Sequence, residues 1–281
     1  MNALKLKNVT KQYKGFTLDN ISLAVPQGSI VGLIGENGAG KSTTIKLILD
    51  LVRPDGGEIE LLGASNREDG QSLRQDVGVL FDEACFPTHF TARQVNWLMR
   101  DLYESWNEET FWEYIRRFEL PEKKKVKDFS RGMKMKLSIA TALSHDAKLL
   151  ILDEPTGGLD PIVRDEVVDI LYDFTRDESH SILISSHIVS DLEKLCDYIA
   201  FLHKGKLLFC RAKDELVEEY GVFHGTEDEL RELDPKAVHG MRRNAYSVDA
   251  LVERARVPGS LPLDRPTVED IILFTVKEAK S

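Results

Sequence analysis

The sequence predicts an α/β fold with a mostly parallel central sheet and an antiparallel β subdomain at its N-terminus. Residues 4–9 and 16–25 alternate apolar and polar side chains, which is typical of antiparallel strands with one buried face. From residue 30 onward the apolar residues form short unbroken runs separated by helical patterns, as in parallel strands that are buried on both faces. These runs cover residues 30–34, 77–81, 149–152 and 182–185, and a strand pair follows at 198–203 and 206–209.

Helical patterns fill the intervals between these strands. The first helix should begin near residue 41 and end before Pro54, because proline disfavours helical geometry in the residue ahead of it. Further along, Thr91 and Gln94 form a capping box, and apolar residues then recur at helical spacing. They are Phe111, Tyr114, Ile115 and Phe118. We therefore expect a helical insert at about residues 86–145.

The C-terminal quarter of the chain differs in composition from the rest. Residues 215–234 are strongly charged, and a loop with two prolines and a glycine follows at residues 257–262. A last helix should start at Thr267 and bury Ile271, Ile272 and Val276. We therefore divide the chain into a main domain at residues 1–212 and a small C-terminal accessory region at residues 213–281.

Composition and charge restrict the class of protein. The 281 residues are 42% hydrophobic, which is enough to fill a substantial core. A formal net charge of −10 disfavours a nucleic-acid partner, because such affinity comes from basic surface, and we interpret the basic run at residues 123–127 as a solvated helix face. No apolar run approaches the ~18 residues of a membrane helix, and the start of the chain lacks a secretory signal. We expect a cytoplasmic chain.

The chain contains three cysteines, Cys85, Cys196 and Cys210. Their positions lack the spacing of a metal site, and an odd number in a chain without an export signal argues against a disulfide framework. We expect buried free thiols.

A glycine-rich stretch after the strand at residues 30–34 is the strongest functional signal. Residues 35–42 fit the pattern G-x-x-x-x-G-K-[ST], with a strand before them and a helix after them. The glycines allow backbone amides to point at phosphate oxygens, Lys41 adds a positive charge, and Ser42 can ligate Mg²⁺. The alternative is an ordinary glycine-rich turn. The predicted ATP-binding residues are Gly35, Glu36, Asn37, Gly38, Ala39, Gly40, Lys41, Ser42 and Thr43.

A pair of carboxylates supports the nucleotide interpretation. Asp153 and Glu154 end the apolar strand at residues 149–152, and ligands of parallel sheets bind at the carboxyl ends of the strands. Asp153 can hold Mg²⁺ through water, while Glu154 can orient or deprotonate the attacking water. A polar strand exit before a proline turn is the alternative for this segment alone. Together the two motifs predict a P-loop NTPase core that binds Mg²⁺ and ATP.

The segment Phe129-Ser-Arg-Gly-Met, just ahead of the acidic strand, indicates how the nucleotide is used. Here the sequence resembles the ATP-binding subunits of ABC transporters, in which a serine-glycine signature closes on the nucleotide of a partner subunit. Ser130 and Gly132 match that signature, whereas Arg131 and Met133 replace its usual glycine and glutamine. From the residues alone, Ser130 is the N-cap of a helix, which places its hydroxyl beside a positive helix end. An ordinary serine-capped helix is the alternative.

Further positions match the family in its order. Asp160 resembles the aspartate of the loop along the dimer seam, and His187 resembles the histidine that contacts the γ-phosphate. Tyr13 resembles the aromatic residue that stacks on adenine. Asp82 stands where the family usually has a glutamine that ligates metal and water. Surface positions for His187 and edge-strand packing for Tyr13 are the alternatives.

The resemblance implies a mechanism in which Lys41, Glu154 and His187 are catalytic and Ser42, Asp153 and Asp82 serve the metal. Two such subunits, identical or different, would trap two Mg²⁺-ATP and drive an integral membrane permease. The subunit would then lie on the inner face of the cell membrane through that permease. The variant signature, Asp82 and the segment at residues 266–272 together resemble the type-2 exporter branch, which implies export.

We also expect Phe86, Pro87 and Phe90 to form an exposed apolar socket for the permease, with internal packing of these rings as the alternative. A rival class is a soluble ABC ATPase without a transport role, of the iron-sulfur assembly type. A kinase with the same phosphate loop would have no use for Ser130 and His187.

Overall fold

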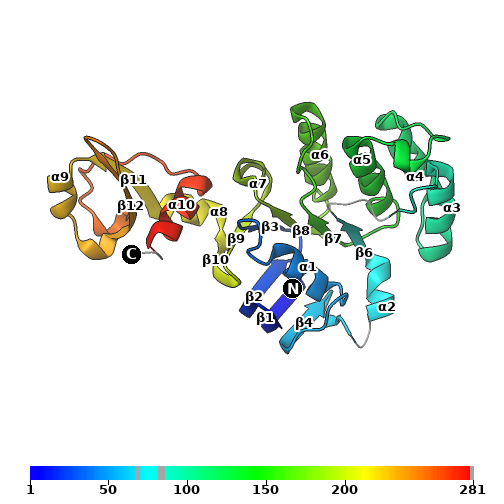
Figure 1. Cartoon of the computed structure of the whole chain (residues 1–281), viewed down its shortest axis with the longest axis horizontal. Coiled ribbons are helices and arrows are strands. Elements are labelled where there is room, and N and C mark those ends of the chain that lie inside the picture. The colour runs from blue at the N-terminus through cyan, green and yellow to red at the C-terminus, as the bar shows by residue number, and fades with distance from the viewer. Residues whose placement is uncertain (68–69, 82–85, 279–281) are drawn as a thin grey trace.

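The computed structural model describes residues 1–67, 70–81 and 86–278. Within these residues the central sheet has six strands in the order β10-β9-β3-β8-β7-β6, which confirms the predicted α/β class (Figure 1). Pairing is parallel from β9 to β6, and only β10 runs antiparallel to its neighbour. The strands are β3 (Ile30–Ile34), β6 (Val77–Leu80), β7 (Leu149–Asp153), β8 (Ser181–Ser186), β9 (Tyr198–His203) and β10 (Lys206–Ala212).

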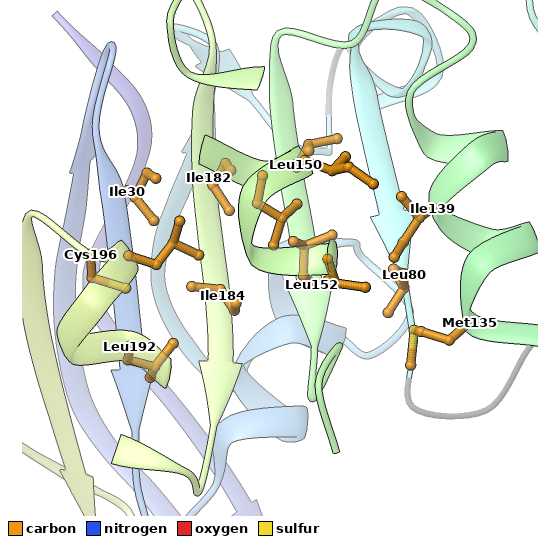
Figure 2. Close-up of a cluster of buried hydrophobic side chains, with 14 of the residues drawn as sticks. Ile30, Leu80, Met135, Ile139, Leu150, Leu152, Ile182, Ile184, Leu192 and Cys196 are labelled. Atoms are coloured by element: carbon orange, nitrogen blue, oxygen red, sulfur yellow. The ribbon is translucent and has the colours of Figure 1, made fainter. Parts of the chain in front are cut away.

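The central strands are buried on both faces, as their unbroken apolar runs require. Successive side chains of a strand point to opposite faces. Ile30, Ile182 and Ile184 therefore meet the helices α5 (Arg131–Ala142) and α7 (Val189–Leu195) on one face (Figure 2). Val31 and Leu33 lie in a second cluster on the other face with apolar residues of α1 (Lys41–Ile48). Helix α6 (Pro161–Phe174) follows β7.

The predicted antiparallel subdomain packs on the α1 face of the sheet (Figure 1). Its strands run in the order β2-β1-β4-β5. They are β1 (Asn2–Tyr13), β2 (Phe16–Pro26), β4 (Gly56–Leu61) and β5 (Ala64–Ser65). Leu4, Leu6 and Val9 of β1 are buried while residues between them are exposed, so the alternation in the sequence corresponds to one buried face. A short helix α2 (Gly70–Leu73) leads from this subdomain to β6.

The helical insert consists of α3 (Ala92–Leu102), α4 (Glu108–Arg117) and α5. Thr91 caps α3 with the predicted capping box to Gln94. Phe111 and Ile115 are buried, which confirms the apolar face of α4. The basic run at residues 123–127 is exposed at its lysines, but the prediction of a helix there was wrong. Lys125 instead forms an isolated bridge with Thr91, and residues 126–128 form a single 3-10 turn. Backbone amides of Val126 and Lys127 donate to the carbonyls of residues 90 and 88.

The accessory region contains a three-stranded antiparallel sheet that the sequence did not predict. Its order is β11-β13-β12, with β11 (Tyr220–Gly225), β12 (Val238–Arg243) and β13 (Val248–Glu253). The helices are α8 (Lys213–Glu219), α9 (Glu227–Arg231) and α10 (Val268–Glu278). Val268, Ile271 and Phe274 of α10 join the same apolar cluster as Leu192 and Leu195 of α7. The boundary at residue 212 stays a prediction.

Two smaller predictions concern the thiols and the membrane. Cys196 is buried and Cys210 is half-buried, both are free, and burial raises the pKa of each thiol. Cys85 and Asp82 lie outside the described residues. Among the helices that the structure describes, none combines the length and apolar character needed to cross a bilayer.

Asp249 on β13 generates a prediction about acid stability. Its side chain accepts hydrogen bonds from His224, Arg242 and Asn244 at 2.8–3.2 Å, and the first two lower its pKa from 3.8 to about 2. Because the pKa is lower in the folded state, the stabilisation is present above the ordinary pKa and is lost as the pH falls toward 2. Asp249→Asn should cost about 1–3 kcal/mol at pH 7.

Urea unfolding of the full chain at several pH values measures this effect. The free-energy gap between the parent and Asp249→Asn should shrink as the pH falls from about 5 to about 2.5. Asp228→Asn, at a side chain that is 90% exposed, is the control and should change stability by less than about 0.5 kcal/mol. A gap that is constant across this pH range would contradict the role of the Asp249 charge.

Candidate nucleotide-binding site

The phosphate loop connects β3 to α1 at the carboxyl edge of the central sheet. Gly40 is the N-cap of α1 and has a φ of 116°, which a residue with a side chain rarely adopts. At Gly35, an added Cβ would lie 2.5 Å from the carbonyl oxygen of Leu202 on β9. The glycines thus let the loop turn tightly against the sheet just before the N-terminus of α1, and helix N-termini are positions where anions bind.

Lys41 crosses this loop and is almost fully buried, with 6% of its surface exposed. Its Nζ donates to the carbonyl oxygen of Gly35 at 2.7 Å and pairs with Glu154 Oε1 at 3.2 Å. A buried ammonium requires such partners, because its desolvation is otherwise costly. These contacts hold the ammonium group against the loop, at the wall of the cavity described below.

Asp153 and Glu154 reach the same edge because β7 ends there. Asp153 is paired with Ser185 of β8 in the parallel register, and it accepts a hydrogen bond from Ser185 Oγ at 2.6 Å. Glu154 follows with a φ of 52°, and its amide bonds to both Oγ and the carbonyl oxygen of Ser185. After this left-handed turn the two neighbouring carboxylates have different partners: Asp153 contacts Ser185, whereas Glu154 contacts Lys41 and His187.

His187 follows β8 and completes a chain of three side chains with Glu154 and Lys41. Its Nδ1 lies 2.6 Å from Glu154 Oε2, and its amide donates to the same oxygen at 3.3 Å. One carboxylate therefore lies between the ammonium of Lys41 and the imidazole of His187. Triphosphate oxygens compete for both of these donors, which would leave Glu154 available to a water molecule.

These groups surround a cavity of about 700 Å³. Its volume lies in the range of small-molecule sites, about 300–1,000 Å³. Of the predicted site residues, the structure brings together Glu36, Asn37, Gly38, Gly40, Lys41, Ser42, Thr43, Asp153, Glu154 and His187. The cavity is also lined by Phe16, Arg131, Gly157 and Gly158, which the prediction of the site did not include.

The cavity wall contains an aromatic ring other than the predicted one. Phe16 lines the cavity, whereas Tyr13 is 45% exposed and lies opposite Phe16 in the β1–β2 register. Lys11 Nζ lies 5.7 Å from the centroid of the Tyr13 ring. The two-residue turn between the strands brings both aromatics to one end of the hairpin, and this spacing is the signal that could have identified Phe16.

Ser130, Gly132 and Asp160 do not line the cavity of their own chain. Ser130 is exposed and caps α5 as predicted, accepting a hydrogen bond from the amide of Met133 at 3.2 Å. Asp160 caps α6 by accepting from the amides of Ile162 and Val163. Both N-caps leave a helix N-terminus at the surface.

The residues present fit a magnesium ion that arrives with a nucleotide. Ser42 and Asp153 line the same cavity and offer hydroxyl and carboxylate oxygens, which Mg²⁺ prefers together with phosphate and water. Within the described part of the chain, no group of three or more His, Cys, Asp or Glu side chains could hold a metal without such additional ligands.

A second cavity, of about 530 Å³, lies between the phosphate loop and the accessory region. It is lined by Glu36 and Asn37 of the loop, by His187, and by Glu269 and Leu273 of α10. The last helix of the chain therefore borders the nucleotide site, which its sequence did not indicate.

The loop between β3 and α1 and the acidic end of β7 define a P-loop NTPase. Residues 18–157 match the ABC transporter family. The bacitracin transport ATP-binding protein BcrA of Bacillus licheniformis is 36% identical over 208 residues, which cover 73% of this chain and 68% of that protein.

Solved structures agree with this likeness. A structure described as the ATP binding subunit of an ABC transporter is 28% identical with a TM-score of 0.70, and the match covers 77% of this chain and 92% of that one. The dimeric bacterial ABC transporter cassette MJ0796 is 25% identical with a TM-score of 0.67, covering 74% and 98%. The chain belongs to the ABC transporter family, as one of its ATP-binding proteins.

Gly35 provides a test of the loop geometry. Gly35→Ala should displace the loop from Leu202, because the added Cβ would clash with a backbone oxygen, and ATP affinity should fall at least about tenfold. Titration with a fluorescent ATP analogue measures this. Gly56→Ala, where an added Cβ meets nothing within 4 Å, is the control and should bind as the parent does. Equal affinity of the two variants would contradict the described loop packing.

Proposed function

We propose that this chain is the ATP-hydrolysing motor subunit of an ABC transporter. It pairs with another ATP-binding subunit around two Mg²⁺-ATP and drives a separate membrane permease in the direction of export. The main support is the arrangement of Lys41, Glu154 and His187 around one cavity, with Ser130 outside it.

The chain's own residues account for nucleotide binding. Backbone amides of the loop and the N-terminus of α1 hold the phosphates, and Lys41 exchanges its contact with Glu154 for the outer phosphates. Ser42 and Asp153 would hold Mg²⁺, which supplies charge neutralisation of the phosphate oxygens when bound. Tyr13 and Phe16 provide aromatic surface for the base at the end of the β1–β2 hairpin.

Hydrolysis requires a base and a donor to the γ-phosphate. Glu154 is fixed by Ser185 through its amide, so its carboxylate can orient a water and accept its proton. His187 lies 2.6 Å from that carboxylate and can donate to the phosphate once the nucleotide is present. Asp82 would contribute as a metal ligand if it reaches the ion, and this role stays a prediction.

A second subunit is needed because the signature serine does not face its own cavity. Ser130 lies at the exposed N-terminus of α5, where its hydroxyl and the helix dipole suit a γ-phosphate that arrives from another molecule. Gly132 and Asp160 lie in the same kind of position outside the cavity. The dimeric form of the MJ0796 cassette supports such an assembly. ATP would close the pair through its higher affinity for the closed state.

The permease contact falls on the helical insert. Phe86 and Pro87 line a cavity of about 160 Å³ with Leu98, Met99 and Tyr103, while Phe90 packs against the core. The three predicted socket residues are half-buried, so they are neither exposed, as the socket prediction had them, nor fully packed inside, as its alternative had them. The cavity has room for one side chain of a short permease helix lying on this surface. Transport of bacitracin by the BcrA system supports a transport role, and we place this chain at the inner face of the membrane through its permease.

Glu154→Gln tests the catalytic proposal. The amide keeps the size of the side chain but cannot accept a proton, so ATP should still bind while turnover falls by at least about 10². With Mg²⁺-ATP the variant should elute as a dimer in size-exclusion chromatography. Glu58→Gln, at a side chain that is 72% exposed on β4, is the control and should hydrolyse ATP normally. Unchanged hydrolysis in Glu154→Gln would remove this residue from the mechanism.

Assembly with the permease is tested by reversing a charge beside the half-buried socket. Asp101 is exposed on α3, next to the cavity residues Leu98 and Met99. Asp101→Lys should reduce recovery of a copurifying integral membrane protein by about fivefold or more, whereas Glu58→Lys should not. Equal recovery would count against the socket, and recovery of soluble partners alone would favour a soluble ABC ATPase.

A further inference from the structure

Arg131 occupies a position where the family usually has a glycine, and its side chain turns back onto its own chain. An added Cβ at Gly158 would lie 2.6 Å from Arg131 Nη1 and 2.9 Å from Cζ, and one at Gly157 would lie 3.6 Å from Nη2. Gly158 has a φ of 68°. The guanidinium therefore packs against the Gly157–Gly158 turn, in space that is available because neither residue has a side chain.

This turn is the direct continuation of Glu154. The amide of Gly157 donates to the carbonyl oxygen of Glu154 at 3.1 Å, and the amide of Leu159 donates to Thr156 at 3.3 Å. Glu154 itself has the left-handed φ of 52°. Such backbone conformations persist only where the surroundings hold them. A group that packs on residues 157 and 158 therefore packs on a turn that is hydrogen-bonded to the backbone of Glu154.

The N-cap of α5 and the first residue of that helix face different sites. Ser130 is exposed and does not line the cavity of its own chain, whereas Arg131 lines that cavity together with Lys41 and Glu154. A cation in the first turn of a helix opposes the helix dipole, so helix stability does not explain an arginine here.

We propose that Arg131 is a positioning residue that acts within its own chain. It holds the Gly157–Gly158 turn so that Glu154 stays aligned on the nucleotide bound by the same chain, while Ser130 acts on the nucleotide of the second subunit. This inference rests on the proposed function, because it assigns adjacent residues to the two different sites of the dimer.

Mixed dimers with one functional phosphate loop test the assignment. One subunit carries Lys41→Ala, so only the other subunit can hold ATP in its loop, and Arg131→Ala is placed on either subunit in turn. On the ATP-holding subunit it should lower kcat about tenfold or more and leave KM within about twofold. On the Lys41→Ala subunit it should leave both constants within about twofold. Ser130→Ala is the matched control and should show the opposite asymmetry.

The outcomes separate this inference from the proposed function. In the first outcome, Ser130→Ala lowers kcat when it is on the Lys41→Ala subunit, as the shared site requires. If Arg131→Ala then lowers kcat from that same subunit, or lowers it from neither subunit, the inference is overturned and the shared site stands. If Ser130→Ala shows no asymmetry, the shared site itself fails. A rise in KM with normal kcat would make Arg131 a binding residue and would also overturn the inference.

A second measurement does not depend on turnover or dimer formation. In hydrogen exchange of the full chain, Arg131→Ala should accelerate exchange in the segment 154–159 by about tenfold, because the turn loses its packing partner. Exchange in the interior of α5 should stay unchanged, which controls for misfolding. Unchanged exchange at 154–159 would contradict the positioning role. Faster exchange throughout α5 would contradict it as well, because Arg131 would then support the helix and not the turn.

Discussion

The burial of the Lys41 ammonium is the constraint on which the rest of the site depends. With 6% of its surface exposed, this cation needs partners, and it contacts Gly35, Glu36 and Glu154. Those contacts tie the end of β3 to the end of β7, and the bond from Glu154 to His187 adds the end of β8. Three strand ends are thus connected through one carboxylate, and a nucleotide must enter by replacing some of these contacts.

Parallel strands make this arrangement possible because their carboxyl ends meet at one edge. The register pairs Asp153 with Ser185 and Ile34 with Ser186. The acidic motif, the histidine and the glycine loop follow these residues, so all three lie at the same edge of the sheet. The apolar side chains that fix this register are the buried isoleucines and leucines that Figure 2 shows between the sheet and its covering helices. Core packing far from the phosphates therefore determines the distances within the site.

In the described part of the chain, some of the site residues line the cavity and others lie outside it at the ends of helices. Phe16 and Arg131 line the cavity, whereas Ser130 and Asp160 cap helices whose N-termini lie outside it. The accessory region is not remote from this division, because Glu269 and Leu273 of α10 border the phosphate loop across a second cavity. A change in the loop on nucleotide binding would alter the surroundings of α10.

Local patterns in the sequence were sufficient for the P-loop, the acidic strand end, the capped helices and the α/β class, because each depends on residue type and spacing over a few positions. Other features depend on contacts between distant segments, and only the tertiary structure decided them. Strand β11 lies in the charged run at residues 215–234 and pairs with β13, which follows only after α9 and β12. The segment 123–127 is fixed by hydrogen bonds to residues 88 and 90, and Phe16 and Arg131 reach the cavity through long-range folding. Short motifs fix local geometry, whereas the direction of a flexible side chain is set by what packs against it.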